Sequence, residues 1–471
     1  MDRRLVLLSA VCVATRLWAL SATDGMFHFD GLYQVLEPAH RIVFGYGITS
    51  WEFSAGMRSM VYPYVVAFLF WFFSLLGVKD ILSLVFVARV PSVLCSVGVV
   101  CLTYLLGSRL YSRDAGFYAG FFAVFSGLLL GLSAQVMAEV PAMFFSLACV
   151  YLFYVALVSG SKTRAFFSGA LLGVSFMFRF AEAVYFVPLV LTALLRGRMG
   201  VLKGFFAGFL LLVFVQGVVD YFSWGFFLHS PAEFVRQNLL EGRAGLFGAQ
   251  PVLYYAAVFL MHLPLLSVMS FSVESRFETK YLWFLLLSYL FVFSILPHKE
   301  VRFMATVLPL FFVLAARGLE KAVIVWGVRT KPAMLSLVIA LFLVFAYGFP
   351  WGQDSTYYRA LNYVGGMDDS SGVAYDMKWF ESGAYTFLHK GIPAVHVSDY
   401  TVTPMLEGVS CGLPERGFVG FQCAALSGVL DSGWVNYLVV SKNESALAPV
   451  LASRNFSLVR SFSGVSVYRR A

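Results

Sequence analysis

Six residues, HKEVRF at 298–303, place two cations, a carboxylate and a histidine between two apolar runs. We predict that a helix begins after Pro297 and that His298 and Arg302, four positions apart, share one of its faces. Such a helix start combines free backbone N–H groups, the positive end of the helix dipole and cationic side chains, and therefore favours a phosphate. The competing interpretation is that Lys299 and Arg302 only anchor the helix at a membrane surface.

Acidic residues follow the first apolar run of the chain. Asp30 precedes a short amphipathic stretch, where a carboxylate can serve as a general base or as a helix N-cap. Glu37 is a second candidate contact, although Arg41 stands four positions later and an intrahelical ion pair is the default interpretation. Arg58 is a third candidate, with a surface pair to Glu52 as its alternative.

Further charged residues lie at the ends of later apolar runs. Glu139 stands at a predicted helix start, where the helix dipole alone favours an acidic residue. Arg179 and Glu182 end another run, and a structural ion pair explains them as well as a ligand contact does. Asp220 lies in VVDYFSWG, whose aromatic residues are typical of a membrane interface.

The composition indicates a membrane protein. The 471 residues are 60% hydrophobic and 13% charged, whereas a soluble domain has about 25% charged residues. The net charge of +8 accompanies no basic stripe with interleaved aromatic residues, so we assign it to loops and expect no nucleic acid. Placing the basic loops in the cytosol predicts about 11 transmembrane helices. They are expected at residues 5–22, 82–107, 115–133, 140–158, 165–180, 182–196, 203–222, 251–271, 281–296, 303–319 and 333–350.

This arrangement predicts two domains. Residues 1–351 form an all-α polytopic membrane domain whose first outer loop is 23–81, and the apolar run at 61–77 is interpreted as an interfacial or re-entrant helix. Residues 352–471 alternate strand-like and helical runs, which predicts a small extracytoplasmic α/β domain. Cys411 and Cys423 are a plausible disulfide in that domain.

Acidic residues and one basic, phosphate-type site beside lipid fit a sugar carried on a lipid phosphate. The leaving phosphate needs cations, and the acceptor hydroxyl needs one carboxylate base on the opposite face of the sugar, as in a single inverting displacement. The sequence contains no Gly-rich phosphate loop and no obvious DxD pair, so we expect neither a nucleotide, nor a metal, nor another cofactor.

HKEVRF resembles the HKExRF signature of glycosyltransferase family 22, the dolichyl-phosphate-mannose-dependent mannosyltransferases of the GT-C superfamily. The stretch FDGLYQVLEPAHRIVFGYGITSWEF resembles the first luminal loop of that family. VVDYFSWG and NLLEGRAGLFGAQPVLYY resemble two further elements. The matches come in family order and cover roughly residues 10–320.

The resemblance implies a GT-C fold and mannosyl transfer, with inversion, from polyprenyl (dolichyl) phosphate mannose to a lipid-linked glycan. The acceptor would be a GPI precursor or a lipid-linked oligosaccharide. The site would face the lumen of the endoplasmic reticulum in a eukaryote, or the outside of the plasma membrane otherwise. Asp30 matches the base position, and Glu139 matches the acidic position of the second outer loop. The signature residues His298, Lys299 and Arg302 would contact the donor, with Glu300 orienting them.

The chain departs from the family pattern at two places that bear on the acceptor. Gly31 follows Asp30 where the family has Asp-Glu, and FGAQPVLYY lacks the usual Thr and Trp. A GT-C enzyme that uses another sugar for a cell-envelope glycan is the first alternative, and a non-catalytic lipid-glycan subunit is the second. A transporter predicts charges at span midpoints and an internal repeat; only Arg16 and Arg89 fit the former, and no repeat is visible.

Overall fold

The computed structural model describes residues 2–22, 25–271, 276–325, 331–346, 355–376, 382–397, 421–424, 426–431, 433–440, 449 and 451–471. The chain forms two compact units. The first comprises Met1–Ala22, Gly56–Val61 and Arg89–Trp351, and the second comprises Thr23–Ala55, Tyr62–Ala88 and Gly352–Ala471. The proposed disulfide involves Cys411, which lies outside the described residues. The division of function between residues 1–351 and 352–471 remains a prediction.

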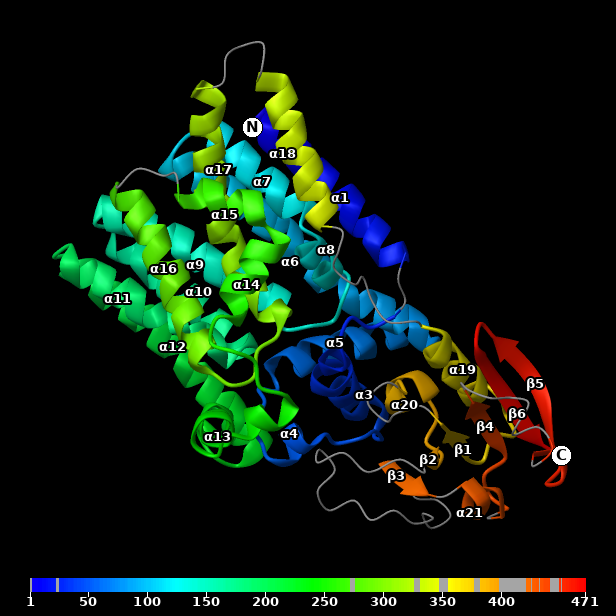
Figure 1. Ribbon diagram of the computed structural model, residues 1–471. Helices are drawn as coiled ribbons and strands as arrows, with labels where there is room; N and C mark the ends of the chain where they lie inside the picture. The colour runs from blue at the N-terminus through cyan, green and yellow to red at the C-terminus, as the bar shows by residue number, and fades with distance from the viewer. Residues whose placement is uncertain are drawn as a thin grey trace. The chain divides into compact units, whose positions relative to one another are not determined.

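The first unit is helical throughout its described part (Figure 1). Its elements are α1 (Arg3–Ala22), most of α6 (Ile81–Leu110), α7 (Arg113–Phe125), α8 (Gly127–Ser133), α9 (Glu139–Ser159), α10 (Lys162–Phe178), η2 (Phe180–Tyr185), α11 (Phe186–Leu195), α12 (Met199–Trp224), α13 (His229–Val235), η3 (Arg236–Leu240), η4 (Arg243–Phe247), α14 (Tyr254–His262), α15 (Pro264–Phe271), α16 (Phe277–Ile295), η5 (Val301–Val307), α17 (Leu308–Val325) and α18 (Lys331–Ala346).

Several of these helices are long and apolar enough to cross a membrane. Within the described residues there are five: α1, α6, α9, α12 and α16. The number rises to seven if each bent pair counts as one span, namely α7 with α8 and α14 with α15. The helical, membrane-type architecture is as expected from the sequence, whereas the expected total of spans stays a prediction.

Glycines bring α10 and α12 into close backbone contact, and the two helices run side by side in Figure 1. A Cβ added to Gly169 would lie 1.9 Å from the carbonyl oxygen of Phe205, and one added to Gly208 would lie 1.9 Å from that of Phe166. Small residues of this kind let membrane helices approach closely. This packing fixes the end of α10, where Arg179 follows as the C-cap residue.

The break between α7 and α8 is capped by a buried arginine. The two helices bend by 59°, which leaves the last carbonyl groups of α7 without partners inside the helix. Arg16, on α1 and 0% exposed, donates from Nη2 to the carbonyl of Ala123 at 3.1 Å, from Nη1 to that of Val124, and from Nε to Ser96 Oγ at 3.2 Å. The charge within this predicted span therefore has a structural use.

The second unit combines segments from both ends of the chain. Its helices are α2 (Phe29–Gly31), η1 (Leu32–Leu36), α3 (Glu37–Phe44), α4 (Trp51–Ser54), most of α5 (Val61–Leu75), the first turns of α6, α19 (Thr356–Gly365), α20 (Ala384–Leu388) and α21 (Leu426–Asp431). Its strands are β1 (Val373–Tyr375), β2 (Ala394–Val397), β3 (Phe421–Ala424), β4 (Tyr437–Val440), β5 (Phe456–Phe462) and β6 (Val465–Arg470).

The strands form one mixed sheet in the order β3-β2-β1-β4-β6-β5. The first four are mutually parallel, and β6 pairs antiparallel with both β4 and β5. Because successive side chains of a strand point to opposite faces, Val373 and Tyr375 of β1 face one core and Ala374 faces the other. Helices α19 and α20 cover the first core, and α21 covers the second.

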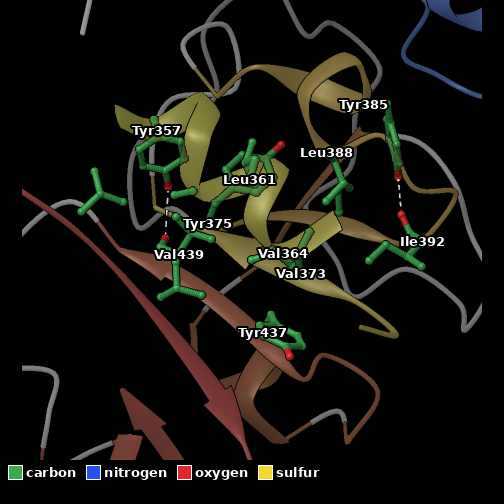
Figure 2. Close-up of a cluster of buried hydrophobic side chains, with 14 residues drawn as sticks. Tyr357, Leu361, Val364, Val373, Tyr375, Tyr385, Leu388, Ile392, Tyr437 and Val439 are labelled. Atoms are coloured by element: carbon green, nitrogen blue, oxygen red, sulfur yellow. Dashed lines mark hydrogen bonds between the residues drawn. The ribbon is translucent and has the colours of Figure 1, made fainter. Parts of the chain in front are cut away.

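Figure 2 shows the first of these cores, which we call the tyrosine core after its buried tyrosines. Tyr357 of α19 donates its hydroxyl to the carbonyl of Val439 at 3.1 Å, and Tyr385 of α20 donates to that of Ile392 at 2.9 Å. Both hydroxyl groups are buried and bonded, so the core accommodates polar atoms without leaving them unsatisfied.

Candidate functional site

The HKEVRF motif does not begin a helix at its first residue. Residues 298–300 lie before the helix, and Glu300, with φ −130° and ψ 149°, is the N-cap of the 3-10 helix η5. The prediction that His298 and Arg302 share one helix face is therefore wrong, because the extended backbone at Glu300 separates them. The histidine and the arginine are related instead through the side chain of Glu300.

Arg302 is held by two carboxylates. Its Nε and Nη2 donate to Glu300 Oε2 at 2.5 Å and Glu300 Oε1 at 3.0 Å, which is the bidentate geometry that arginine favours. Its Nη1 donates to Glu139 Oε1 at 2.9 Å, and the side chains of Arg302 and Glu139 are 5% and 7% exposed. The guanidinium is thus fixed from both sides by residues of η5 and α9.

His298 continues this chain of contacts. Its Nε2 lies 2.8 Å from Glu300 Oε1, and its Nδ1 lies 3.2 Å from the carbonyl oxygen of Gly248. Burial lowers the pKa of His298, but the hydrogen bond to Glu300 and the charge of Glu300 outweigh burial, so the pKa is raised above its ordinary value. In the protonated ring both nitrogens donate, which matches two oxygen partners.

Lys299 is placed differently from the other cations of the motif. The residue is 4% exposed, and its Nζ donates to the carbonyl oxygens of Gln250 at 2.9 Å and Leu296 at 2.5 Å. Among the described residues no carboxylate forms an ion pair with it. Burial lowers the pKa of Lys299. An ammonium group has three donors, and two of those of Lys299 are used by these carbonyl oxygens.

Arg179 joins the cluster through an aromatic ring. Its guanidinium lies 4.9 Å from the centre of the Phe303 ring, and that of Arg302 lies 5.2 Å from the same ring. Arg179 Nη1 is 3.5 Å from Glu182 Oε1 and 3.4 Å from the Tyr289 hydroxyl. The expected Arg179–Glu182 ion pair is therefore formed, and it lies beside the motif.

Asp220 and Arg58 belong to a separate group. Asp220 is 0% exposed and accepts hydrogen bonds from Gln216 Nε2 at 2.8 Å, Ser230 N at 2.9 Å and Ser230 Oγ at 2.6 Å. Gln216 Oε1 accepts from the hydroxyl of Ser59 at 3.1 Å, next to Arg58 in the sequence. These bonds fasten the start of α13 and the 56–61 segment to α12.

Asp30 lies in the second unit, inside the short helix α2. The helix N-cap is His28, whose Nδ1 accepts from Asp30 N at 3.2 Å, so the interpretation of Asp30 as an N-cap is wrong. His28 Nδ1 also lies 3.4 Å from Asp30 Oδ1, and the Asp30 side chain is 18% exposed. The carboxylate is thus partly open to solvent, with a histidine beside it.

Glu37, also in the second unit, accepts hydrogen bonds from residues distant in the sequence and does not pair with Arg41. It is 0% exposed, and its carboxylate accepts from Ile48 N at 2.7 Å and from Thr386 N at 2.9 Å. Burial raises the pKa of the Glu37 carboxyl, and the hydrogen bonds from Thr386 and Ile48 act in the opposite direction. The default expectation of an intrahelical pair is therefore wrong.

The structure thus brings part of the expected set together. Glu139, Arg179, His298, Glu300 and Arg302 form one contiguous cluster with Lys299 beside it, which we call the motif cluster. Among the described residues, no three His, Cys, Asp or Glu side chains are placed to share a metal ion.

Two hydroxyl groups beside the motif cluster were not predicted from the sequence. Tyr289 donates to the carbonyl of Phe303 at 3.0 Å, and Thr306 Oγ1 donates to Glu182 Oε1 at 3.1 Å. Both residues lie in apolar runs, where a buried hydroxyl group requires a partner. That requirement is a usable signal, although it does not identify the partner.

Solved structures share the fold of this chain. ArnT from Cupriavidus metallidurans bound to undecaprenyl phosphate matches with a TM-score of 0.61 at 13% identity, over 98% of this chain and 97% of that chain. The archaeal oligosaccharyltransferase AglB from Archaeoglobus fulgidus, in complex with an inhibitory peptide and a dolichol-phosphate, matches with a TM-score of 0.52 at 13% identity, over 99% and 74%. At these identities the likeness concerns the fold, which is of the GT-C type.

Three similar proteins are named as GPI mannosyltransferases. GPI alpha-1,2-mannosyltransferase 3 of Bos taurus is 24% identical over 397 residues, which are 81% of this chain and 71% of that protein. GPI mannosyltransferase 3 of Yarrowia lipolytica is 26% identical over 83% of this chain and 75% of that protein. The Drosophila melanogaster protein of the same name is 26% identical over 72% of this chain and 60% of that protein.

The family assignment rests on most of the chain. The sequence model of the Alg9-like mannosyltransferase family matches residues 7–389, a range that holds Asp30, Glu139 and the 298–303 motif. This match confirms the resemblance to glycosyltransferase family 22. With its apolar helices and GT-C fold, the chain is an integral membrane glycosyltransferase and belongs to the Alg9-like mannosyltransferase family.

Proposed function

We propose that the protein transfers mannose from a polyprenyl phosphate mannose, such as the dolichyl form, to a GPI precursor, with inversion at the sugar. The named relatives support the acceptor class. The fold shared with proteins solved with undecaprenyl phosphate and dolichol-phosphate supports a polyprenyl-phosphate donor. A lipid-linked oligosaccharide is the second acceptor to test, since the family as a whole is named for an Alg9-like activity.

The observation that carries this proposal is the placement of Lys299. Its ammonium group is buried, has two carbonyl partners and forms no ion pair within the described residues. A buried charge without a counter-ion is costly, and a bound anion removes that cost. The donor phosphate is an anion of the right kind, and it gains negative charge as the bond to the sugar breaks.

The other members of the motif cluster supply further positive charge and keep the charged side chains in fixed orientations. Glu139 and Glu300 fix Arg302, and Glu300 also keeps His298 beside it. Fixed cations that already face the developing charge lower the barrier because they need no reorganisation during the reaction. We assign His298, Lys299 and Arg302 to the donor phosphate or sugar, and we assign Glu300 and Glu139 to their orientation, with Arg179 as a further cation of the cluster.

Asp30 is the proposed general base. The acceptor hydroxyl gives its proton to the carboxylate while its oxygen attacks the anomeric carbon, and the bond from that carbon to the phosphate oxygen breaks. The products are the glycan with one more mannose and the polyprenyl phosphate. His28 Nδ1 accepts from Asp30 N at 3.2 Å, which helps to fix the backbone that carries the carboxylate. Arg58, Glu37 and Asp220 are assigned to support rather than to the reacting groups.

We place the reaction on the luminal face of the endoplasmic reticulum if the cell is eukaryotic, or otherwise on the outer face of the plasma membrane. About 11 spans with residues 352–471 outside the cytosol agree with the bias of basic residues toward cytoplasmic loops. The apolar run of α5 then lies at the outer membrane surface. Cysteine labelling from either side of sealed vesicles tests this topology.

The function is tested by transfer in membranes. Radiolabelled polyprenyl phosphate mannose is supplied with purified GPI precursor or lipid-linked oligosaccharide, and wild type is compared with Lys299→Met. We expect label in the GPI precursor and a donor KM raised about 30-fold or more in the variant, because truncating one member of a buried charge contact costs about 2 kcal/mol or more. Lys280→Met, at an exposed lysine of α16, is the matched control and keeps the wild-type KM.

Each other outcome removes a defined part of the proposal. If only the lipid-linked oligosaccharide becomes labelled, that oligosaccharide replaces the GPI precursor as the acceptor. Transfer from a different polyprenyl phosphate sugar, with none from the mannose donor, replaces the sugar and favours a cell-envelope glycan. An unchanged donor KM in Lys299→Met removes the phosphate contact.

A further inference from the structure

The strongest unexplained feature lies in the second unit, where Glu37 joins the loop that carries Asp30 to the C-terminal segment. Glu37 Oε2 accepts from Thr386 N at 2.9 Å and from Thr386 Oγ1 at 2.6 Å, and Oε1 accepts from Tyr385 N at 3.3 Å and from Ile48 N at 2.7 Å. Thr386 is also 0% exposed. A buried carboxylate persists only where donors replace the lost water, and here four donors do so.

Three of the four donors come from the first turn of α20. Gly383, with φ 90°, is the N-cap of this helix, and Tyr385 and Thr386 follow in its first turn. The first N–H groups of a helix lack partners within it and point toward the positive end of the dipole, where a carboxylate is favoured. Ser382 Oγ accepts from Ala384 N at 3.3 Å, and Glu37 supplies the acceptors for the next two N–H groups, those of Tyr385 and Thr386.

Further residues of the 37–48 segment also contact the C-terminal segment. His40 Nε2 lies 3.0 Å from His389 Nδ1, and the Phe44 and His389 rings meet edge to face at 4.6 Å. Tyr46 and Ile48 pack against the tyrosine core of Figure 2. The loop segment 37–48 is thus docked on the C-terminal segment by polar and apolar contacts together, an attachment that we call the loop clasp.

A continuous helical segment connects Asp30 to this clasp. The helix that carries Asp30, α2, spans only Phe29–Gly31 and continues through the π-helix η1 directly into α3, which begins at Glu37. A short helix followed by a π turn is marginal by itself, so tertiary contacts must hold the backbone of this segment. Burial of Leu32 and Leu36, both 0% exposed, is one such contact, and the bonds at the far end of the segment are another. The far end is Glu37.

We propose that Glu37 is a positioning residue for Asp30, and that residues 382–391 of the C-terminal segment form part of the catalytic apparatus by holding it. This inference rests on the proposed function only in naming Asp30 as the base. It also assigns a use to α20 and His389, which stand at the end of the region matched by the family model.

Four variants test the clasp in the full-length protein. Glu37→Gln and Thr386→Val each remove an acceptor or a donor of the clasp, and Thr386→Ser keeps the hydroxyl donor. Tyr357→Phe removes a buried hydroxyl of the same unit whose partners include Asp376 Oδ1 and the carbonyl of Val439. We expect kcat about 10-fold or more lower in the first two, because a displacement near 1 Å can cost up to about 100-fold in rate. The donor KM should stay within about two-fold of wild type, since the donor contacts lie in the motif cluster. Thr386→Ser and Tyr357→Phe should keep the wild-type kcat.

Amide hydrogen exchange provides a readout that needs no activity. We expect faster exchange at residues 29–36 in Glu37→Gln and Thr386→Val but not in the other two variants. Unchanged exchange in both, or an equal loss of kcat in Tyr357→Phe, overturns the inference. If exchange rises while Asp30→Asn remains active, the clasp is supported and the assignment of the base fails instead.

Discussion

Glu139 and Arg302 are separated by 163 positions in the sequence, yet Glu139 Oε1 and Arg302 Nη1 are 2.9 Å apart. Glu139 is the first residue of α9, and Arg302 lies in the first turn of η5. The bond therefore ties together the starts of two helices, at a place where both side chains are almost fully buried. A buried ion pair contributes little by itself, but removal of one partner leaves a costly unpaired charge.

The first prediction follows from that asymmetry. Glu139→Leu should lower the free energy of unfolding by about 3 kcal/mol, because the Arg302 charge loses one of its two carboxylates. The double variant Glu139→Leu/Arg302→Met should recover most of that stability but lose transfer, because Arg302 is assigned to the donor. Thermal unfolding in detergent and the transfer assay measure the two effects separately.

An exposed ion pair of the same unit provides the control. Arg236 is 50% exposed and pairs with Glu233 at 2.7 Å, so Arg236→Met should lower the free energy of unfolding much less than Glu139→Leu does. Equal costs for Glu139→Leu and Arg236→Met would show that burial of the Glu139–Arg302 pair has no energetic consequence.

The second prediction concerns pH. Because the pKa of His298 is raised above 6.5, its charge persists below that pH and is lost as the pH rises through the raised value. The corresponding stability is fully present below pH 6.5 and disappears over the same alkaline interval. We expect kcat/KM for the donor to fall as the pH rises through the raised pKa of His298, since the neutral ring attracts the phosphate less.

Two variants check the assignment of this alkaline limb. His298→Gln should abolish it, and Glu300→Gln should move it to lower pH, because the hydrogen bond and charge of Glu300 are what raise the pKa. A pH profile of kcat/KM identical to wild type in both variants contradicts the role of His298.

The sequence predicted the helices well because the length of an apolar run sets the length of a membrane helix. The expected runs at 82–107, 140–158 and 203–222 lie within α6, α9 and α12. Residue type singled out His298, Lys299 and Arg302 as candidates, whereas Glu139 and Glu300 became candidates through the family resemblance. The sequence did not predict the contact of Glu139 with Arg302, since local pattern carries no information about partners so distant in the chain.

The partners of Glu37 and the strand β5 could not be predicted from the sequence, for two different physical reasons. Glu37 looked like half of an intrahelical pair because spacing alone favours Arg41, whereas its actual donors are backbone N–H groups, which have no sequence signature. The strand β5 was not expected, because only Phe456 is buried and Leu458 is 51% exposed. A strand with a mostly solvated surface at a sheet edge shows no clear alternation.

The last prediction compares two arginines of α1. Arg16 is fully buried and donates to the carbonyls of Ala123 and Val124 at the break after α7. Arg4 is 46% exposed and pairs with Asp114. Arg16→Met should cost about 2–4 kcal/mol, because two backbone carbonyls then lack donors in apolar surroundings. Arg4→Met should cost less than about 1 kcal/mol. Thermal unfolding in detergent distinguishes them, and Arg16→Lys, which retains a donor, should fall between the two. If Arg16→Met unfolds like Arg4→Met, the bend between α7 and α8 does not depend on this cap.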